Sequence, residues 1–107
     1  MFDIKKMMDA IKDASQMQQQ IQEELKNEVV EGSAGGGMVT AKMNGHFELM
    51  DIHIEASVYQ MNDPAFLQDM VKAAVNDASK KARELLAEKM KSLSGRLGLP
   101  GGMPFGS

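Results

Sequence analysis

The first residues able to do chemistry are Asp51, His53 and Glu55. Their alternate spacing places them on one side of an extended strand, where two carboxylates and an imidazole could bind a metal ion weakly. No further ligand is evident, and a solvated or interface surface explains the same pattern. The sequence therefore predicts no metal site and no cofactor.

The groups needed for covalent catalysis are also missing. The 107 residues include no cysteine, which excludes thiol nucleophiles, disulfides and cysteine-ligated zinc and is typical of a cytoplasmic protein. There is no Gly-x-Ser-x-Gly, His-Glu-x-x-His or dinucleotide-binding motif. Residues 35–37 are three glycines that could cradle a phosphate, but a strand is predicted to follow them instead of the Lys-Ser/Thr that begins the helix of a phosphate-binding loop. We expect neither an enzyme nor a binder of small-molecule substrates.

Basic side chains form the second chemical group, and they are unevenly distributed. Residues 14–79 contain three lysines against ten acidic residues, whereas residues 80–107 contain six basic residues against two acidic ones. Lysine and arginine can bind phosphates without reading sequence. The predicted DNA-binding residues are Lys80, Lys81, Arg83, Lys89, Lys91 and Arg96, with help from Lys5, Lys6 and Lys12. A solvated helix surface with internal pairs, Lys80 with Glu84 and Glu88 with Lys91, is the alternative.

Two long helices must position these charges. Apolar residues recur at steps of three and four from Asp3 to Asn27, which predicts an amphipathic helix of roughly 35 to 40 Å. Its second half has only a narrow apolar seam, as in helices that pair with another helix. Asn62-Asp63-Pro64 predicts the start of a second helix, and Ser94-Gly95 predicts its C-cap.

Three strands are predicted between the helices. Val29–Glu31 is followed by a glycine-rich turn, and residues 38–55 form a β-hairpin with Asn44-Gly45 as a two-residue type I′ turn. Met43 would then lie opposite His46. Apolar residues fall on both faces of this hairpin, so we expect a second subunit to cover part of one face. The predicted dimer-interface residues are Met38, Thr40, Phe47 and Leu49.

The resulting fold class is α+β, with an α-β-β-β-α protomer and a three-stranded antiparallel sheet. Residues 1–95 form a single domain, and residues 96–107 form a tail rich in Gly and Pro. Strands of about seven residues give a sheet of roughly 23 Å, which is shorter than either helix. Both helices should therefore protrude, bury their seams against each other and carry the basic residues at one free end.

The chain resembles the YbaB/EbfC family of nucleoid-associated DNA-binding proteins. The resemblance rests on Met17-Gln-Gln-Gln, Gly35-Gly-Gly-Met-Val39, Asn44-Gly45, the segment 69–78, Glu88-Lys-Met90 and the segment 97–105. It implies a tweezer-like homodimer that binds double-stranded DNA in the nucleoid and alters DNA conformation. Effects on gene expression, nucleoid organisation and DNA protection are implied in the same way.

A protein-binding clamp or chaperone-like adaptor is the alternative function. The chain contains eleven methionines, whose flexible side chains can grip varied apolar segments. The N-terminal residues alternate charged with apolar types, unlike a signal peptide, and no apolar run is long enough to span a membrane. We therefore expect no membrane partner.

Overall fold

The computed structural model describes residues 3–96, except for the side chain of Arg96. Along the chain lie α1 (Ile4–Asn27), β1 (Val29–Ala34), the 3-10 turn η1 (Gly35–Gly37), β2 (Val39–Asn44), β3 (Leu49–Ile54), α2 (Ala56–Gln60) and α3 (Pro64–Arg96). The predicted α+β order is confirmed, and α2 is an element that the sequence did not predict. Residues 97–107 of the predicted tail lie outside the described residues.

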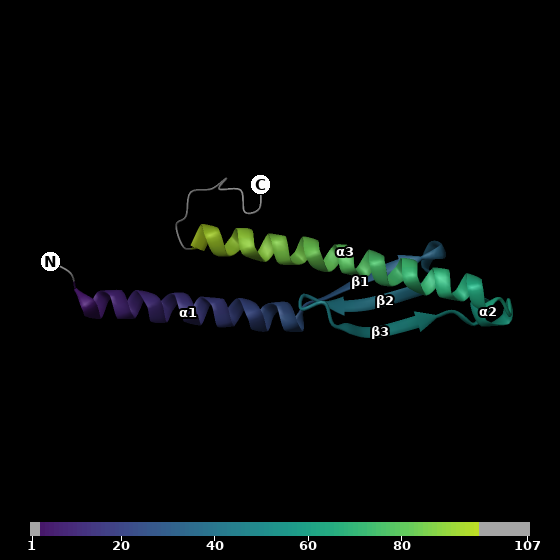
Figure 1. Ribbon diagram of the computed structural model, residues 1–107, viewed down its shortest axis with the longest axis horizontal. Helices are drawn as coiled ribbons and strands as arrows, with labels where there is room; N and C mark the ends of the chain where they lie inside the picture. Colours follow the sequence, from purple (N-terminus) through teal and green to yellow (C-terminus); the bar gives the residue numbers. More distant parts are fainter. Residues whose placement is uncertain (1–2, 97–107) are drawn as a thin grey trace.

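The three strands form one antiparallel sheet in the order β1-β2-β3, and α3 crosses one face of it (Figure 1). Val39, Ala41 and Met43 of β2 are buried beneath α3, together with Val58 of α2. The helix contributes three buried alanines spaced one turn apart, Ala74, Ala78 and Ala82. Small side chains at this spacing bring the helix backbone close to the sheet.

Gly32 of β1 lies at the closest point of this approach. A Cβ atom at this position would lie 2.1 Å from the backbone nitrogen of Ala78 and 2.5 Å from the carbonyl oxygen of Ala74. Only glycine fits there, because both neighbours are backbone atoms that a rotamer change cannot move. The alanine stripe of α3 and this glycine together set the distance between helix and sheet.

The hairpin turn differs from the prediction. Met43 pairs with Leu49, and a register shift lies between Lys42 and Met43, so the predicted pairing of Met43 with His46 is wrong. Residues 45–48 join the strands, and the positive φ of 62° falls at Phe47. The physical reason is that the Asn44 side chain turns inward to organise the loop instead of occupying a type I′ turn.

The Asn44 side chain is buried with four hydrogen bonds. Its Oδ1 accepts from the backbone N–H of His46 at 2.9 Å and of Glu48 at 3.1 Å. Its Nδ2 donates to Glu48 Oε1 at 3.0 Å and to the carbonyl oxygen of Lys26, in the last turn of α1, at 3.1 Å. The backbone N–H of Gly45 also donates to the Leu25 carbonyl at 2.7 Å. The hairpin loop is therefore joined to the end of α1.

The two helices begin where the sequence predicts. Asp3 caps α1 by accepting from the backbone N–H of Lys5 at 3.1 Å, and Asp63 caps α3 by accepting from that of Phe66 at 3.1 Å. The predicted C-cap at Ser94-Gly95 is wrong, because α3 continues to Arg96 and Gly95 does not adopt a positive φ. Glycine permits the left-handed conformation of such a cap but does not impose it.

The helices leave the sheet on the same side, and α1 reaches further than α3 (Figure 1). The only fully buried residues of α1 are Ile21 and Leu25, in its last turns. Ile4, Met8 and Ile11 are 63–65% exposed. The prediction that the two seams bury each other therefore holds only near the sheet, because α3 ends before it reaches the first half of α1.

Candidate nucleic-acid interface

The exposed side of α3 carries a row of cationic side chains. Lys80, Arg83 and Lys91 are separated by three and eight positions, which at about 100° per residue places them on one side of the helix. That side lies opposite the buried alanines, so all three point away from the sheet. We call Lys80, Arg83 and Lys91 the outer stripe. The exposed residues Ala87 and Glu84 lie on the same side of the helix, so the stripe also contains one carboxylate.

Lys81 lies at the edge of the sheet, and its ammonium already binds other groups of the protein. Its Nζ donates to the carbonyl oxygen of Glu31 at 2.9 Å and lies 3.3 Å from Asp77 Oδ2. The same Asp77 oxygen accepts from the backbone N–H of Ser33 at 3.0 Å. This hydrogen bond from Ser33, followed by that from Lys81, lowers the pKa of Asp77. Two side chains of α3 thus bind the outer edge of β1.

The ammonium of Lys89 also binds other groups of the protein, on the side of α3 that faces α1. Its Nζ lies 2.7 Å from Glu28 Oε1 and 3.2 Å from Glu24 Oε2. Hydrogen bonds to Glu28 and then Glu24 raise the pKa of Lys89, so it remains charged through neutral pH. Within residues 3–96 the ion pairs are these two and Lys81–Asp77, so neither predicted pair on α3, Lys80 with Glu84 or Glu88 with Lys91, is formed.

The remaining predicted DNA-binding residues lie on α1 and at the end of α3. Lys5, Lys6 and Lys12 are exposed on the half of α1 that extends beyond α3. Arg96 is the last residue of α3, and its side chain lies outside the described residues. Lys80, Lys81 and Arg83 lie level with the sheet instead of at the free end, because Ala78 and Ala82 beside them pack on it. The structure therefore spreads the nine residues over two regions.

The four predicted interface residues do not form one patch. Met38 packs against the core at the start of β2, whereas Thr40 is half-buried and pairs with His53. Phe47 and Leu49 lie together at the hairpin loop and are 41% and 46% exposed. Met50, which the sequence did not single out, is 57% exposed beside them. These three apolar side chains and Val29 of β1, which is 50% exposed, are the large exposed apolar residues of the sheet and its hairpin loop.

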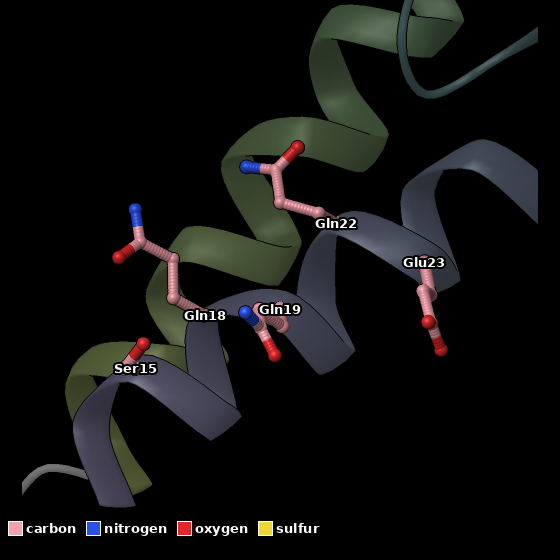
Figure 2. A pocket seen from close by; sticks show the side chains of 5 residues that line it. All are labelled: Ser15, Gln18, Gln19, Gln22 and Glu23. Carbon is pink, nitrogen blue, oxygen red and sulfur yellow. The ribbon is translucent and has the colours of Figure 1, made fainter. Parts of the chain in front are cut away.

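A shallow polar depression runs along the exposed surface of α1. It is lined by Ser15, Gln18, Gln19, Gln22 and Glu23, which all come from this helix and point in different directions (Figure 2). With no enclosing second element, it offers hydrogen bonds along a rod and no enclosed ligand site. No cluster of three metal-ligating side chains occurs in the described part of the chain, so Asp51, His53 and Glu55 form no such group. Among residues 3–96 no helix is both long and apolar enough to cross a membrane.

The sequence and the fold both have relatives. The model of the YbaB/EbfC DNA-binding family matches residues 1–97. A nucleoid-associated protein from Chloroflexus aurantiacus is 49% identical over 87 residues, covering 78% of this chain and 87% of that protein. One from Thermoanaerobacter pseudethanolicus is 47% identical over 94 residues, covering 85% of each chain. The crystal structure of an uncharacterized Helicobacter pylori protein, 28% identical, superposes with a TM-score of 0.67 over 84% of this chain and 98% of that one.

Proposed function

Because this chain belongs to the YbaB/EbfC DNA-binding family, we propose that it is a non-enzymatic nucleoid-associated protein that binds double-stranded DNA as a homodimer. It acts on DNA in the nucleoid, within the cytoplasm, and changes DNA conformation. The outer stripe of α3 is the single observation that carries this proposal beyond the family. The family match favours DNA over the protein-binding clamp.

Contact with DNA is limited to parts of the surface. Residues 14–79 carry ten acidic side chains against three lysines, and this body repels phosphates. The outer stripe lies on the solvent side of α3, and Lys5, Lys6 and Lys12 lie on the protruding end of α1. These two regions can bind the backbone of one duplex while the acidic body stays away from it. Binding through phosphates gives affinity with little sequence preference.

A salt titration of DNA affinity tests the role of the stripe. We expect log Kd to rise linearly with log salt, and Lys80→Gln, Arg83→Gln and Lys91→Gln to lower the slope by about 0.9 for each phosphate that is no longer bound. Lys42→Gln is the matched control, because Lys42 is exposed but lies on the sheet face away from α3. An unchanged slope in the triple stripe variant, or an equal decrease in the control, would contradict the proposal.

The homodimer is supported by the uncovered apolar side chains Phe47, Leu49 and Met50. Light scattering after size exclusion should give twice the 11.7 kDa mass of one chain. Leu49→Glu combined with Phe47→Glu should give a monomer, because a buried unpaired carboxylate is costly. Tyr59→Glu, at an exposed residue of α2, is the control. A wild-type mass of one chain would refute dimerisation, whatever the DNA result.

A further inference from the structure

Only the last turns of α1 are held by the rest of the protein, through packing, the hydrogen bonds of the hairpin loop and Lys89. Ile21 and Leu25 are its only fully buried residues, and of residues 3–20 only Met17 is even half-buried. About 25 Å of helix therefore extends beyond Ile21 without packing of its own. If the direction of α1 at Ile21 changed by about 10°, the N-terminal end of the helix would move by about 4 Å. The position of Lys5 and Lys6 depends on what fixes that base.

Lys89 links the base of α1 directly to α3. It comes 65 positions after Glu24 in the sequence, and its Nζ reaches Glu24 in the last turn of α1 and Glu28, the C-cap residue that follows the helix. One ammonium therefore contacts both the last turn of the facing helix and its C-cap residue. Two contacts separated along the axis resist both sliding and rotation of α1, which a single contact would not.

The same geometry makes Lys89 a poor phosphate ligand. Its side chain is only 22% exposed, against 46% for Lys81. Removing its ammonium from this bridge would leave two carboxylates one turn apart without a counter-ion, which is unfavourable. The pKa of Lys89 is raised above 10.5, so the charge of the bridge is stable through neutral pH and disappears only as pH rises through that raised value.

We propose that Lys89 is a positioning residue that holds α1 at a fixed angle to α3 through Glu24 and Glu28, and that it does not bind DNA. It thereby sets the distance from Lys5, Lys6 and Lys12 to the outer stripe. The effect of Lys89 on DNA binding rests on the proposed function, whereas its effect on the angle between α1 and α3 does not. The two parts can therefore fail separately.

Electron-spin distance measurements test the mechanical part. The chain has no cysteine, so spin labels can be placed at Asp9→Cys on α1 and Ala87→Cys on α3, both exposed. Labelled protein is diluted with unlabelled protein to remove distances between subunits. We expect Lys89→Met to broaden the distance distribution or shift it by several ångströms, and Lys91→Met to leave it unchanged. The charge-reversed variant Glu24→Lys, Glu28→Lys, Lys89→Glu should restore the original distribution.

DNA measurements on the same variants test the second part. Lys89→Met should weaken binding or change the bend of an end-labelled duplex. In a background with Lys5→Gln, Lys6→Gln and Lys12→Gln, where movement of α1 changes no lysine–phosphate contact, Lys89→Met should leave the salt slope unchanged. Lys91→Met should lower that slope by about 0.9 if its ammonium binds one phosphate. A reduced slope caused by Lys89→Met in that background would show that Lys89 binds a phosphate and would overturn the assignment. Unchanged spin-label distances in Lys89→Met and in Glu24→Gln, Glu28→Gln would also overturn it, even if the wild-type protein failed to bind DNA.

Discussion

At the scale of single residues, Asn44 shows how one side chain can replace a standard turn. Asn-Gly is a sound sequence signal for a two-residue hairpin. Here the asparagine amide instead bonds the hairpin loop and the carbonyl of Lys26, which lies 18 positions earlier. A contact with such a distant residue leaves no local pattern in the sequence. The strands themselves could be predicted because their composition is a local signal, whereas the turn and the register it sets could not.

Replacing Asn44 by alanine should destabilise the protein strongly. The change removes four part-buried hydrogen bonds, each contributing about 0.5–1.5 kcal/mol. Urea denaturation should show that the unfolding free energy falls by at least about 2 kcal/mol. Asn76→Ala on the exposed surface of α3 is the control and should change the unfolding free energy by less than about 0.5 kcal/mol. Equal effects of the two substitutions would refute the role of the buried amide.

Replacing Gly32 by alanine should also be severe, for a steric reason. The new methyl group would lie 2.1 Å from a backbone atom of α3, so the helix would have to move away from the sheet. Overpacking of this kind typically costs about 1–3 kcal/mol in the unfolding free energy, and a clash with backbone atoms places this site at the upper end. Gly95→Ala is the matched control, since within the described residues nothing beyond its chain neighbours and its own helix backbone lies within 4 Å of the added carbon, and thermal melting should show little change or a small gain. A tolerated Gly32→Ala would mean that helix and sheet are not in direct contact.

At the scale of elements, both helices could be predicted nearly to the residue. Their apolar periodicity and the caps Asp3 and Asp63 are local signals. The length over which the two helices lie side by side could not be predicted, because it depends on where α3 passes over the sheet. The charges that the sequence groups as one basic arm therefore divide into the outer stripe, the edge contact of Lys81 and the bridge of Lys89.

The contact between α3 and β1 should make stability depend on acid pH. The pKa of Asp77 lies below its ordinary 3.8 in the folded protein because the carboxylate accepts from Ser33 and Lys81. Its contribution to stability is therefore fully present above about pH 5 and declines as pH falls through and below 3.8. NMR titration should locate this pKa, and Asp77→Asn should flatten the pH dependence of unfolding in that range. An Asp77 pKa at or above 3.8 would contradict the contact.

At the scale of the whole molecule, the protein is a rod of 74 × 25 × 16 Å with a small packed body and long uncovered helices. The sequence predicted this imbalance, because a strand of six or seven residues is much shorter than either helix. It did not predict the separation of the cationic regions along the rod. A duplex that contacts both the outer stripe and the end of α1 must follow the rod, so DNA conformation depends on how rigidly the two helices are held.

The hydrogen bonds of Asp77 and Lys81 to β1 bear on how many copies of this chain could associate through their sheets. A sheet has two borders, and each can recruit another strand unless it is blocked. Here α3 blocks the β1 border, whereas in the described chain no hydrogen bond from another element reaches the outer side of β3. If copies join through the β3 border, strand-by-strand growth would therefore stop after one addition, and the blocked β1 border would guard the protein against forming fibrils. Asp77→Ala with Lys81→Ala should remove this guard, and light scattering would then detect open-ended polymers that the wild-type protein does not form.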